Sequence, residues 1–227
     1  GLEAIEDNED PEKIVVGLQK GFDNLEAVGS DELGMSDIME LVYGNLLDQN
    51  KPDKVYYPTG LTQYDETLKG HGFGAGQLCV WAARPGLGKT TVVLNAAMHN
   101  VKMGTPVGFV SLEMDEEEIG EKVAALECQL PLDIFEDKVA SAEQMTKMHK
   151  VIKNLAKLPL HIDNRSRSLS QIIIKCKQWV KKKGVKMVIV DYCQLIRGDK
   201  NLPREQQIAE ISRELKLLAS DLKIPIL

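Results

Sequence analysis

One short run, Ala-Arg-Pro-Gly-Leu-Gly-Lys-Thr-Thr at residues 83–91, constrains this chain more than any other feature. It follows an apolar run at residues 78–83, which predicts a buried strand, and it precedes residues 91–102, where apolar residues recur at helical spacing. A strand, a glycine-rich turn and a helix in this order form a phosphate-binding loop, whose backbone N–H groups and helix dipole hold phosphate oxygens. The sequence therefore predicts a nucleoside triphosphate site.

The residues of this loop have distinct expected roles. Lys89 is expected to reach the β- and γ-phosphates, and the Thr90 hydroxyl to bind Mg²⁺. The residues expected to contact nucleotide are Arg84, Pro85, Gly86, Leu87, Gly88, Lys89, Thr90 and Thr91. Ala83 stands where the strict pattern G-x-x-x-x-G-K-[ST] has glycine, and a methyl group is tolerated there if φ is negative. The alternative is a strand–turn–helix that contains Gly-Lys-Thr by chance.

Downstream of residue 58, predicted strands alternate with predicted helices. Strands are expected at residues 106–112, 160–163, 186–191 and from 224 onward, and helices at 115–129, 141–157, from 168, and at 205–222. Ser141 and Ser168 each precede a glutamine by three residues, which predicts capping boxes at two helix starts. The alternation predicts an α/β fold in which helices cover both faces of a mostly parallel central sheet.

Two carboxylates end predicted strands. Asp191 follows four apolar residues about 100 residues after the phosphate loop, where it is expected to support Mg²⁺. Its alternative role is to cap a turn. Glu113 ends the strand that follows the phosphate-loop helix, and we expect it to orient or deprotonate the attacking water as a general base. The neighbouring Asp115 and residues 116–118 are interpreted as negative charge at a helix N-terminus.

Charge divides the chain. Residues 1–55 carry 14 acidic and 4 basic side chains, a net charge of −10, whereas the remainder carries 24 basic and 20 acidic side chains, a net charge of +4. We predict an acidic helical linker region at residues 1–55, with one helix after Asp10-Pro11 and a second at about 36–49, and an ATPase domain at residues 56–227. The apolar stripe of the second helix must be buried against its own domain or against a neighbouring copy of the chain.

Composition excludes some classes of protein. No apolar stretch approaches the ~20 residues of a membrane-spanning helix, so no membrane partner is expected. The cysteines form no C-x-x-C pair, which predicts reduced thiols in a cytosolic protein; they are Cys79, Cys128, Cys176 and Cys193. The chain starts at Gly1 and stops at Leu227 within a predicted strand, which indicates a fragment truncated at its C-terminus.

Three motifs in this order and spacing carry a family resemblance: Ala-Arg-Pro-x-x-Gly-Lys-Thr-Thr at 83–91, Ser-Leu-Glu-Met at 111–114 and Val-Asp-Tyr-x-Gln-Leu at 190–195. Together they resemble the RecA-like motor domain of bacterial or phage DnaB-family replicative helicases. Pro58-Thr59-Gly60 and residues 208–216 add to the resemblance, which covers the chain from roughly residue 10 to its end. The helix at 36–49 resembles the family's linker helix, which docks on the adjacent subunit.

The resemblance implies a hexameric ring that hydrolyses ATP, or another NTP, with Mg²⁺ at subunit interfaces. Such a ring travels 5′→3′ on single-stranded DNA, unwinds the replication fork, and meets a helicase loader and primase in the cytoplasm of a bacterium or phage-infected cell. The family's further DNA-binding loops and arginine finger would lie beyond Leu227. An arginine finger is worth about 10³–10⁵ in rate, so we expect this segment alone to bind nucleotide but hydrolyse it poorly.

By the same resemblance, Lys89 and Thr90 bind phosphate and Mg²⁺, Glu113 activates water, and Asp191 supports the metal. Gln194 is expected to sense the nucleotide state or to link it to DNA-facing loops, with an ordinary polar role as the alternative. Residues 197–204 occupy the place of a loop that faces the ring channel. The cations expected to touch DNA phosphates there are Arg197, Lys200 and Arg204, and an ordinary solvated loop is the alternative.

Two other functions compete with a ring helicase. A RecA-superfamily recombinase, repair or circadian-clock-type ATPase shares the phosphate loop and the metal aspartate, but does not typically combine Ser-Leu-Glu-Met with Asp-Tyr-x-Gln-Leu. A nucleotide-gated assembly module without motor activity, docked through the helix at 36–49, is the third possibility. Glu113 argues against it, because a scaffold needs no water-activating carboxylate.

Overall fold

The computed structural model describes residues 34–47, 55–84, 86–197 and 202–227. The chain divides into two units, residues 1–53 and residues 54–227. In the first unit, α2 (Met35–Leu47) is the helix predicted at 36–49. Several of its apolar side chains are exposed, namely Met35, Ile38, Met39, Val42 and Tyr43. The helix predicted after Asp10-Pro11 lies outside the described residues.

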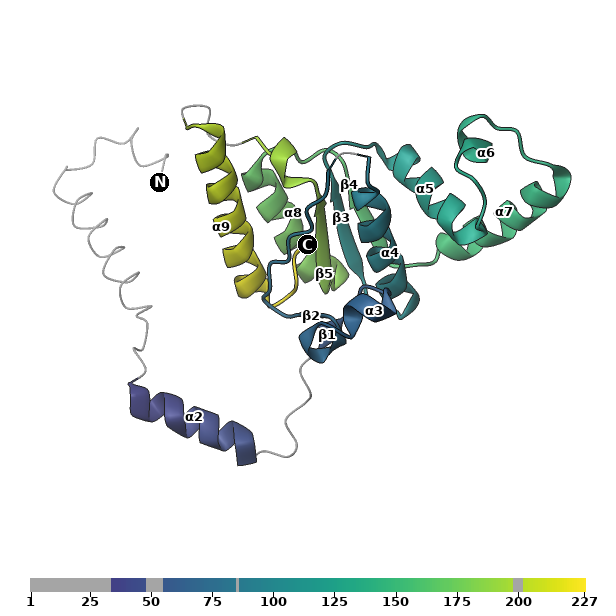
Figure 1. Ribbon diagram of the computed structural model, residues 1–227. Coiled ribbons are helices and arrows are strands. Elements are labelled where there is room, and N and C mark those ends of the chain that lie inside the picture. Colours follow the sequence, from purple (N-terminus) through teal and green to yellow (C-terminus); the bar gives the residue numbers. More distant parts are fainter. Residues whose placement is uncertain (1–33, 48–54, 85, 198–201) are drawn as a thin grey trace, which may run out of the picture. The chain divides into compact units, whose positions relative to one another are not determined.

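The second unit is built on a three-stranded parallel sheet (Figure 1). β3 (Val107–Ser111) lies between β4 (Leu160–Asp163) and β5 (Met187–Asp191). Ser111 pairs with Asp191 in the register of β3 and β5, so the carboxyl ends of these strands meet at one edge. This is the edge at which ligands bind in open α/β sheets.

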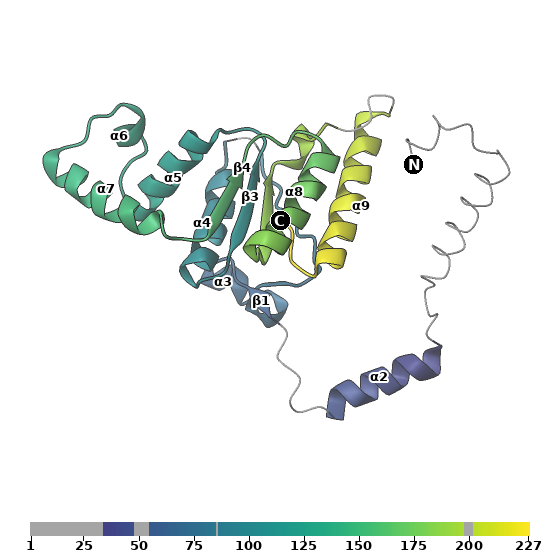
Figure 2. The ribbon, with the colours of Figure 1, turned by 180° about the vertical axis from the view of Figure 1, so that it is seen from behind.

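Helices cover both faces of the sheet, as predicted (Figures 1 and 2). Phe109 and Ile189 pack in a core with α4 (Lys89–Lys102) and α5 (Glu116–Cys128). Their strand neighbours Val110 and Val188 point the other way, into a second core with α8 (Leu169–Lys183) and α9 (Arg204–Leu222). Successive strand residues alternate between faces, which explains why the strands are apolar at nearly every position.

A smaller helical group extends from α5. It contains α6 (Asp133–Glu136) and α7 (Ala142–Leu155), and its core includes Phe135 and Cys128. The capping boxes predicted at Ser141 and Ser168 are both present, at the starts of α7 and α8. A third capping box, at Asp115, starts α5.

The prediction of a buried strand at residues 78–83 is wrong in most of its length. Leu78 forms a single parallel bridge with Ile226, and the Cys79 N–H donates to the Ile226 carbonyl at 2.9 Å. Val80 is 70% exposed. Among the described residues, 80–83 pair with no strand. An apolar run becomes a β-strand only where a neighbouring strand provides hydrogen-bond partners, and the sequence pattern does not show whether one is present. The strand predicted from 224 onward is likewise reduced to bridges of Ile226 with Leu78 and Val188.

A small antiparallel pair precedes this segment and was not predicted. β1 (Tyr56–Tyr57) pairs with β2 (Phe73–Gly74), and the connection holds α3 (Thr62–Asp65) and a 3₁₀ turn, η2 (Lys69–His71). Two-residue strands are too short to show alternation in a sequence. No helix among the described residues is long and apolar enough to cross a membrane.

The cysteines are unpaired, as predicted. Cys128 and Cys176 are buried, and Cys79 and Cys193 are half-buried. Burial and the nearby Asp163 charge raise the pKa of the Cys176 thiol to about 12. A thiol with so high a pKa is not a nucleophile at neutral pH, so Cys176 has a packing role.

Candidate functional site

The phosphate loop joins the extended segment at residues 79–84 to the N-terminus of α4. Gly86 and Gly88 have φ values of +80° and +79°, a left-handed conformation that residues with a side chain rarely adopt. Gly88 is also the N-cap of α4 and supplies no side-chain acceptor. The first N–H groups of α4 are therefore available to an anion at the loop.

Thr90 and Asp191 meet at the base of this loop. The Thr90 hydroxyl donates a 2.6 Å hydrogen bond to the Asp191 Oδ2 atom. Asp191 is 7% exposed at the end of β5, and Thr90 lies in the first turn of α4. Hydroxyl and carboxylate oxygens are hard ligands of the kind that Mg²⁺ takes alongside nucleotide phosphates, so this pair fits the predicted metal role.

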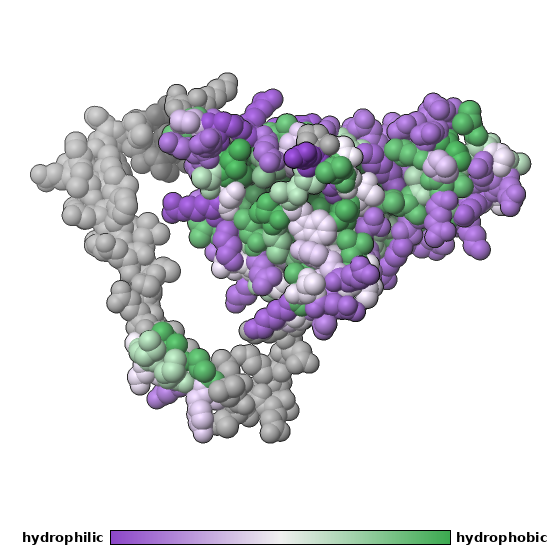
Figure 3. All heavy atoms as spheres, in the orientation of Figure 1, coloured by the Kyte–Doolittle hydropathy of each residue, from purple (hydrophilic) through white to green (hydrophobic). Residues whose placement is uncertain are grey.

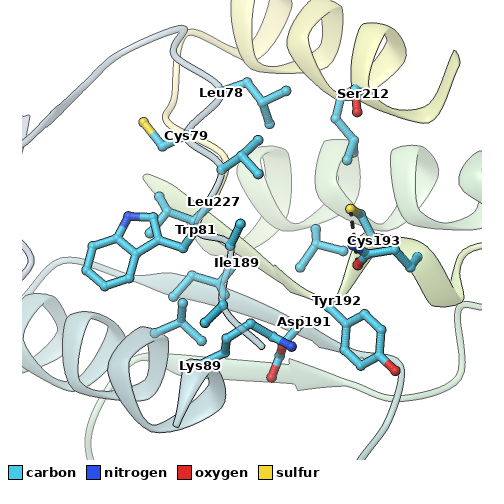
Figure 4. A pocket seen from close by; sticks show the side chains of 17 residues that line it. Leu78, Cys79, Trp81, Lys89, Ile189, Asp191, Tyr192, Cys193, Ser212 and Leu227 are labelled. Carbon is cyan, nitrogen blue, oxygen red and sulfur yellow. Dashed lines mark hydrogen bonds between the residues drawn. The ribbon is translucent and has the colours of Figure 1, made fainter. Parts of the chain in front are cut away.

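Lys89 lies next to the end of β5, the strand that carries Asp191. Its Nζ atom is 4.7 Å from the centroid of the Tyr192 ring. Figure 4 shows the Lys89, Asp191 and Tyr192 side chains gathered at one corner of a pocket of about 140 Å³. The ring face attracts the ammonium group, which keeps the Lys89 cation at the strand end.

A larger cavity of about 680 Å³ opens beside the loop, and its size suits a small-molecule ligand. It brings together the phosphate loop, Glu113 and Gln194. Its lining residues are Ala83, Arg84, Gly86, Gly88, Lys89, Thr90, Thr91, Glu113, Met114, Glu118, Lys122, Tyr192 and Gln194. Asp191 lines the adjoining smaller pocket, which shares Lys89 with the larger one. The Leu87 side chain is 69% exposed, and Pro85 lies outside the described residues.

The smaller pocket has apolar walls. Leu78, Trp81 and Leu227 line it together with Leu215 of α9. Figure 3 shows apolar side chains gathered on the face of this domain beside α9. The larger cavity therefore adjoins a pocket with apolar walls and is itself lined by the phosphate loop.

Glu113 stands on a turn that is fixed on both sides. Before it, the Leu112 N–H donates to the Asp191 carbonyl at 2.8 Å. After it, the Met114 N–H donates to the Ser111 hydroxyl at 3.1 Å, and that hydroxyl donates back to the Met114 carbonyl at 2.6 Å. The Glu113 side chain itself is exposed and lines the larger cavity. The carboxylate is thus free to face a ligand while its backbone is held.

The segment that follows Gln194 is bonded back to it through Arg204. The Arg204 guanidinium donates to the Gln194 carbonyl and also to the Gln207 Oε1 atom, the latter at 2.7 Å. The exposed Arg197 donates its backbone N–H to the Arg167 carbonyl at 3.0 Å. Lys200 lies outside the described residues. Of the three cations predicted to contact DNA, Arg204 is held within the chain in this structure.

A buried carboxylate stabilises the neighbouring strand end. Asp163 ends β4 with its side chain 4% exposed, and it accepts from the Lys175 Nζ atom at 3.0 Å and the Ser166 N–H at 3.1 Å. Burial raises the pKa of Asp163, but the hydrogen bonds from Ser166 and Lys175 outweigh burial, so its pKa is lowered. Asp163 is therefore an ionised structural group at neutral pH.

Three residues around the site were not predicted from the sequence to have a role there. Tyr192 stands in the Asp-Tyr-x-Gln-Leu motif, but the motif alone assigns it no role. Lys122 lines the cavity one helical turn after Glu118, a spacing that becomes informative only once α5 is placed. Arg167 reaches the Leu112 carbonyl across 55 residues, and no local pattern predicts such a contact.

Comparisons with known proteins agree with this architecture. A replicative DNA helicase DnaB of Leifsonia xyli subsp. xyli is 36% identical over 173 residues, which cover 75% of this chain and 37% of the relative. A replicative DNA helicase DnaC of Bacillus subtilis is 31% identical over 199 residues, which cover 85% of this chain and 43% of the relative. The chain thus spans about two fifths of the length of these relatives.

Solved structures confirm the predicted RecA-like α/β fold. A solved ATPase domain matches with a TM-score of 0.73 and 25% identity, covering 86% of this chain and 70% of that one. A DnaB-like replicative helicase, described with its interactions with primase, matches with a TM-score of 0.72 and 24% identity. The match covers 95% of this chain and 52% of that one. The family model for the DnaB-like helicase C-terminal domain matches residues 57–227. With the phosphate loop, the Asp191 strand and the Glu113 turn in this order, the chain belongs to the DnaB-like helicase C-terminal domain family.

Proposed function

We propose that this chain is the ATPase motor of a replicative DNA helicase. The observation that carries the proposal is the Thr90–Asp191 hydrogen bond, which joins the phosphate loop to the carboxylate strand at the edge of the cavity lined by Glu113. Nucleotide binding is common to the family, and a cavity of about 680 Å³ beside the phosphate loop supports it for this chain. ATP is the proposed nucleotide, with Mg²⁺ as its metal.

Each site residue has one proposed task. Lys89 and the first N–H groups of α4 bind the phosphates, and Arg84, Gly86 and Thr91 line the cavity around them. Thr90 and Asp191 hold the Mg²⁺ ion, which neutralises phosphate charge when bound. Glu113 orients and deprotonates the attacking water, since its carboxylate is exposed to the cavity on a fixed turn.

Assembly and DNA contact complete the proposal. We propose that residues 1–55 form a linker region and residues 56–227 the ATPase domain, and that the exposed apolar residues of α2 dock on an adjacent copy in a hexameric ring. Gln194 would report the nucleotide state to residues 197–204, whose Arg197, Lys200 and Arg204 would contact single-stranded DNA. A helicase loader and primase are the proposed protein partners, in the cytoplasm of a bacterium or phage-infected cell.

The test is unwinding of forked DNA by the full-length protein with MgATP. The forks carry a single-stranded loading tail on either the 5′ or the 3′ side, and Lys89→Ala serves as the nucleotide-site control. Unwinding that requires the 5′ tail and disappears in Lys89→Ala is the expected result. ATP hydrolysis without unwinding of either fork would instead favour a RecA-superfamily recombinase, an assembly module, or a helicase that requires a loader partner.

A further inference from the structure

The short connection between β4 and α8 contacts the Glu113 turn from the side opposite to β5. The Arg167 guanidinium donates to the carbonyl of Leu112, the residue before Glu113. Three residues earlier, the Asn164 side-chain amide donates to the Glu116 carboxylate at 2.7 Å. The connection is thus bonded to the chain both before and after Glu113, without itself lining the nucleotide cavity.

The same connection is bonded to the segment that follows Gln194. The Arg167 carbonyl accepts from the Arg197 N–H at 3.0 Å, and Ser168 forms a parallel bridge with Arg197. Arg167 therefore bonds with its side chain to the strand end that carries Glu113 and with its backbone to the start of the 197–204 loop. Arg167 thereby connects the Glu113 turn to the Arg197 segment.

The connection is braced by hydrogen bonds among its own residues, so a displacement at one point is passed on to the rest. Asp163 anchors one end through Ser166 and Lys175. At the other end, the Gln171 Oε1 atom accepts from the N–H groups of Arg167 and Ser168, at 2.9 and 3.1 Å. A segment braced in this way moves as a unit, whereas a loose loop would absorb a shift in its own dihedral angles.

We propose that Arg167 is a positioning residue that couples the Glu113 turn to the Arg197 segment. A movement of Arg197 on contact with DNA pulls on the Arg167 backbone, and the guanidinium passes that movement to the Leu112 carbonyl and so to the direction of Glu113. This inference rests on the proposed function, because it takes Glu113 as the base and residues 197–204 as the DNA-facing loop. Arg167 itself does not line the cavity proposed for the nucleotide, and it acts through Leu112 and Arg197.

The coupling is reciprocal, so it can be measured by binding as well as by turnover. The first readout is the affinity for a fluorescent oligo-dT strand, measured by anisotropy with and without a non-hydrolysable MgATP analogue. The second is the kcat and KM of ATP hydrolysis with and without oligo-dT. The variants are Arg167→Ala and Arg167→Met, of which the second keeps the apolar stem, and the matched control is Arg165→Ala. Arg165 is exposed on the same connection.

In the wild-type protein and Arg165→Ala, the analogue should change the affinity for oligo-dT by about fivefold or more. Both Arg167 variants should lose most of that change, and oligo-dT should no longer raise their kcat, while the KM for ATP and the affinity for oligo-dT without nucleotide stay at wild-type values. Wild-type coupling in either Arg167 variant would overturn the proposal. Loss of analogue binding in both would overturn it too, because Arg167 would then be a structural residue.

The wild-type protein separates this inference from the function on which it rests. All measurements use the full-length protein, and full-length wild type that neither binds the analogue nor hydrolyses ATP would contradict the proposed function. Active wild-type protein whose coupling survives the loss of Arg167 would contradict the inference alone.

Discussion

The hydroxyl of Thr90 donates a 2.6 Å hydrogen bond to the carboxylate of Asp191, although 101 residues separate them in the chain. The contact exists because α4 begins directly after the phosphate loop and β5 ends at the same edge of the sheet. It places two oxygen ligands side by side next to the N–H groups of a helix N-terminus. Phosphate and metal recognition are thereby assembled from two distant motifs.

Removal of the Thr90 hydroxyl should weaken the dependence of nucleotide binding on magnesium. Thr90→Ala leaves Asp191 alone to hold the ion, so the gain in affinity for a fluorescent ATP analogue that Mg²⁺ provides over EDTA should fall by about 10–100-fold. Thr90→Ser keeps the hydroxyl and should behave like the wild type. An unchanged magnesium effect in Thr90→Ala would place the metal elsewhere.

Gly108 should not tolerate a side chain. It lies in β3 directly under the Trp179 ring, and a Cβ atom added there would overlap that ring. Gly108→Ala should therefore reduce the free energy of unfolding by about 1–3 kcal/mol, through overpacking of the core between β3 and α8.

Gly120 provides the opposite case. It lies on the exposed side of α5, with no atom near the position of an added Cβ. Gly120→Ala should increase the free energy of unfolding by roughly 0.5–1 kcal/mol, since alanine is the better helix former. Denaturant titration measures the free energy of unfolding of both variants. Equal changes in the two variants would contradict the packing described for β3.

The Asp163 network predicts a pH-dependent contribution to stability. The folded pKa of Asp163 is below its ordinary value of 3.8, because hydrogen bonds from Ser166 and Lys175 outweigh the effect of burial. Its stabilising contribution is therefore complete above that ordinary value and is lost as the pH falls through the lower folded pKa.

Asp163→Asn tests this contribution. At pH 7 it should lower the free energy of unfolding by about 1–3 kcal/mol, and the difference from wild type should narrow as the pH falls below about 4. The exposed Asp221→Asn is the control and should stay within about 0.5 kcal/mol of wild type. A difference that stays constant from pH 7 to pH 3 would argue against an ionised Asp163 in the folded state.

The features that the sequence predicted well are those with a local cause. Apolar positions predicted the helices α4, α5 and α8, and helices were also predicted where α7 and α9 lie. The Ser-x-x-Gln patterns predicted two helix starts that the structure confirms with reciprocal hydrogen bonds. Glu113 and Asp191 were each predicted at the end of a strand, and the structure brings these two strand ends to one edge, where Ser111 pairs with Asp191.

The features that escaped prediction depend on distant partners. Residues 78–83 are apolar, but a strand needs a paired neighbour, and within the described ranges Leu78 and Cys79 pair only with Ile226. The Arg167–Leu112 contact depends on the register of β3 beside β4, which no pattern around Arg167 encodes. The Lys89–Tyr192 contact depends in the same way on where α4 meets β5.

Glu113→Gln offers the most direct test of the proposed site, because it removes the carboxylate charge and leaves the shape of the cavity. The measurement compares MgATP binding and steady-state ATP turnover between this variant and the full-length wild-type protein. We expect nucleotide affinity close to wild type and turnover reduced by about 10²–10⁴-fold. Wild-type turnover in Glu113→Gln would contradict the proposed role of Glu113, since another group would then have to activate the water.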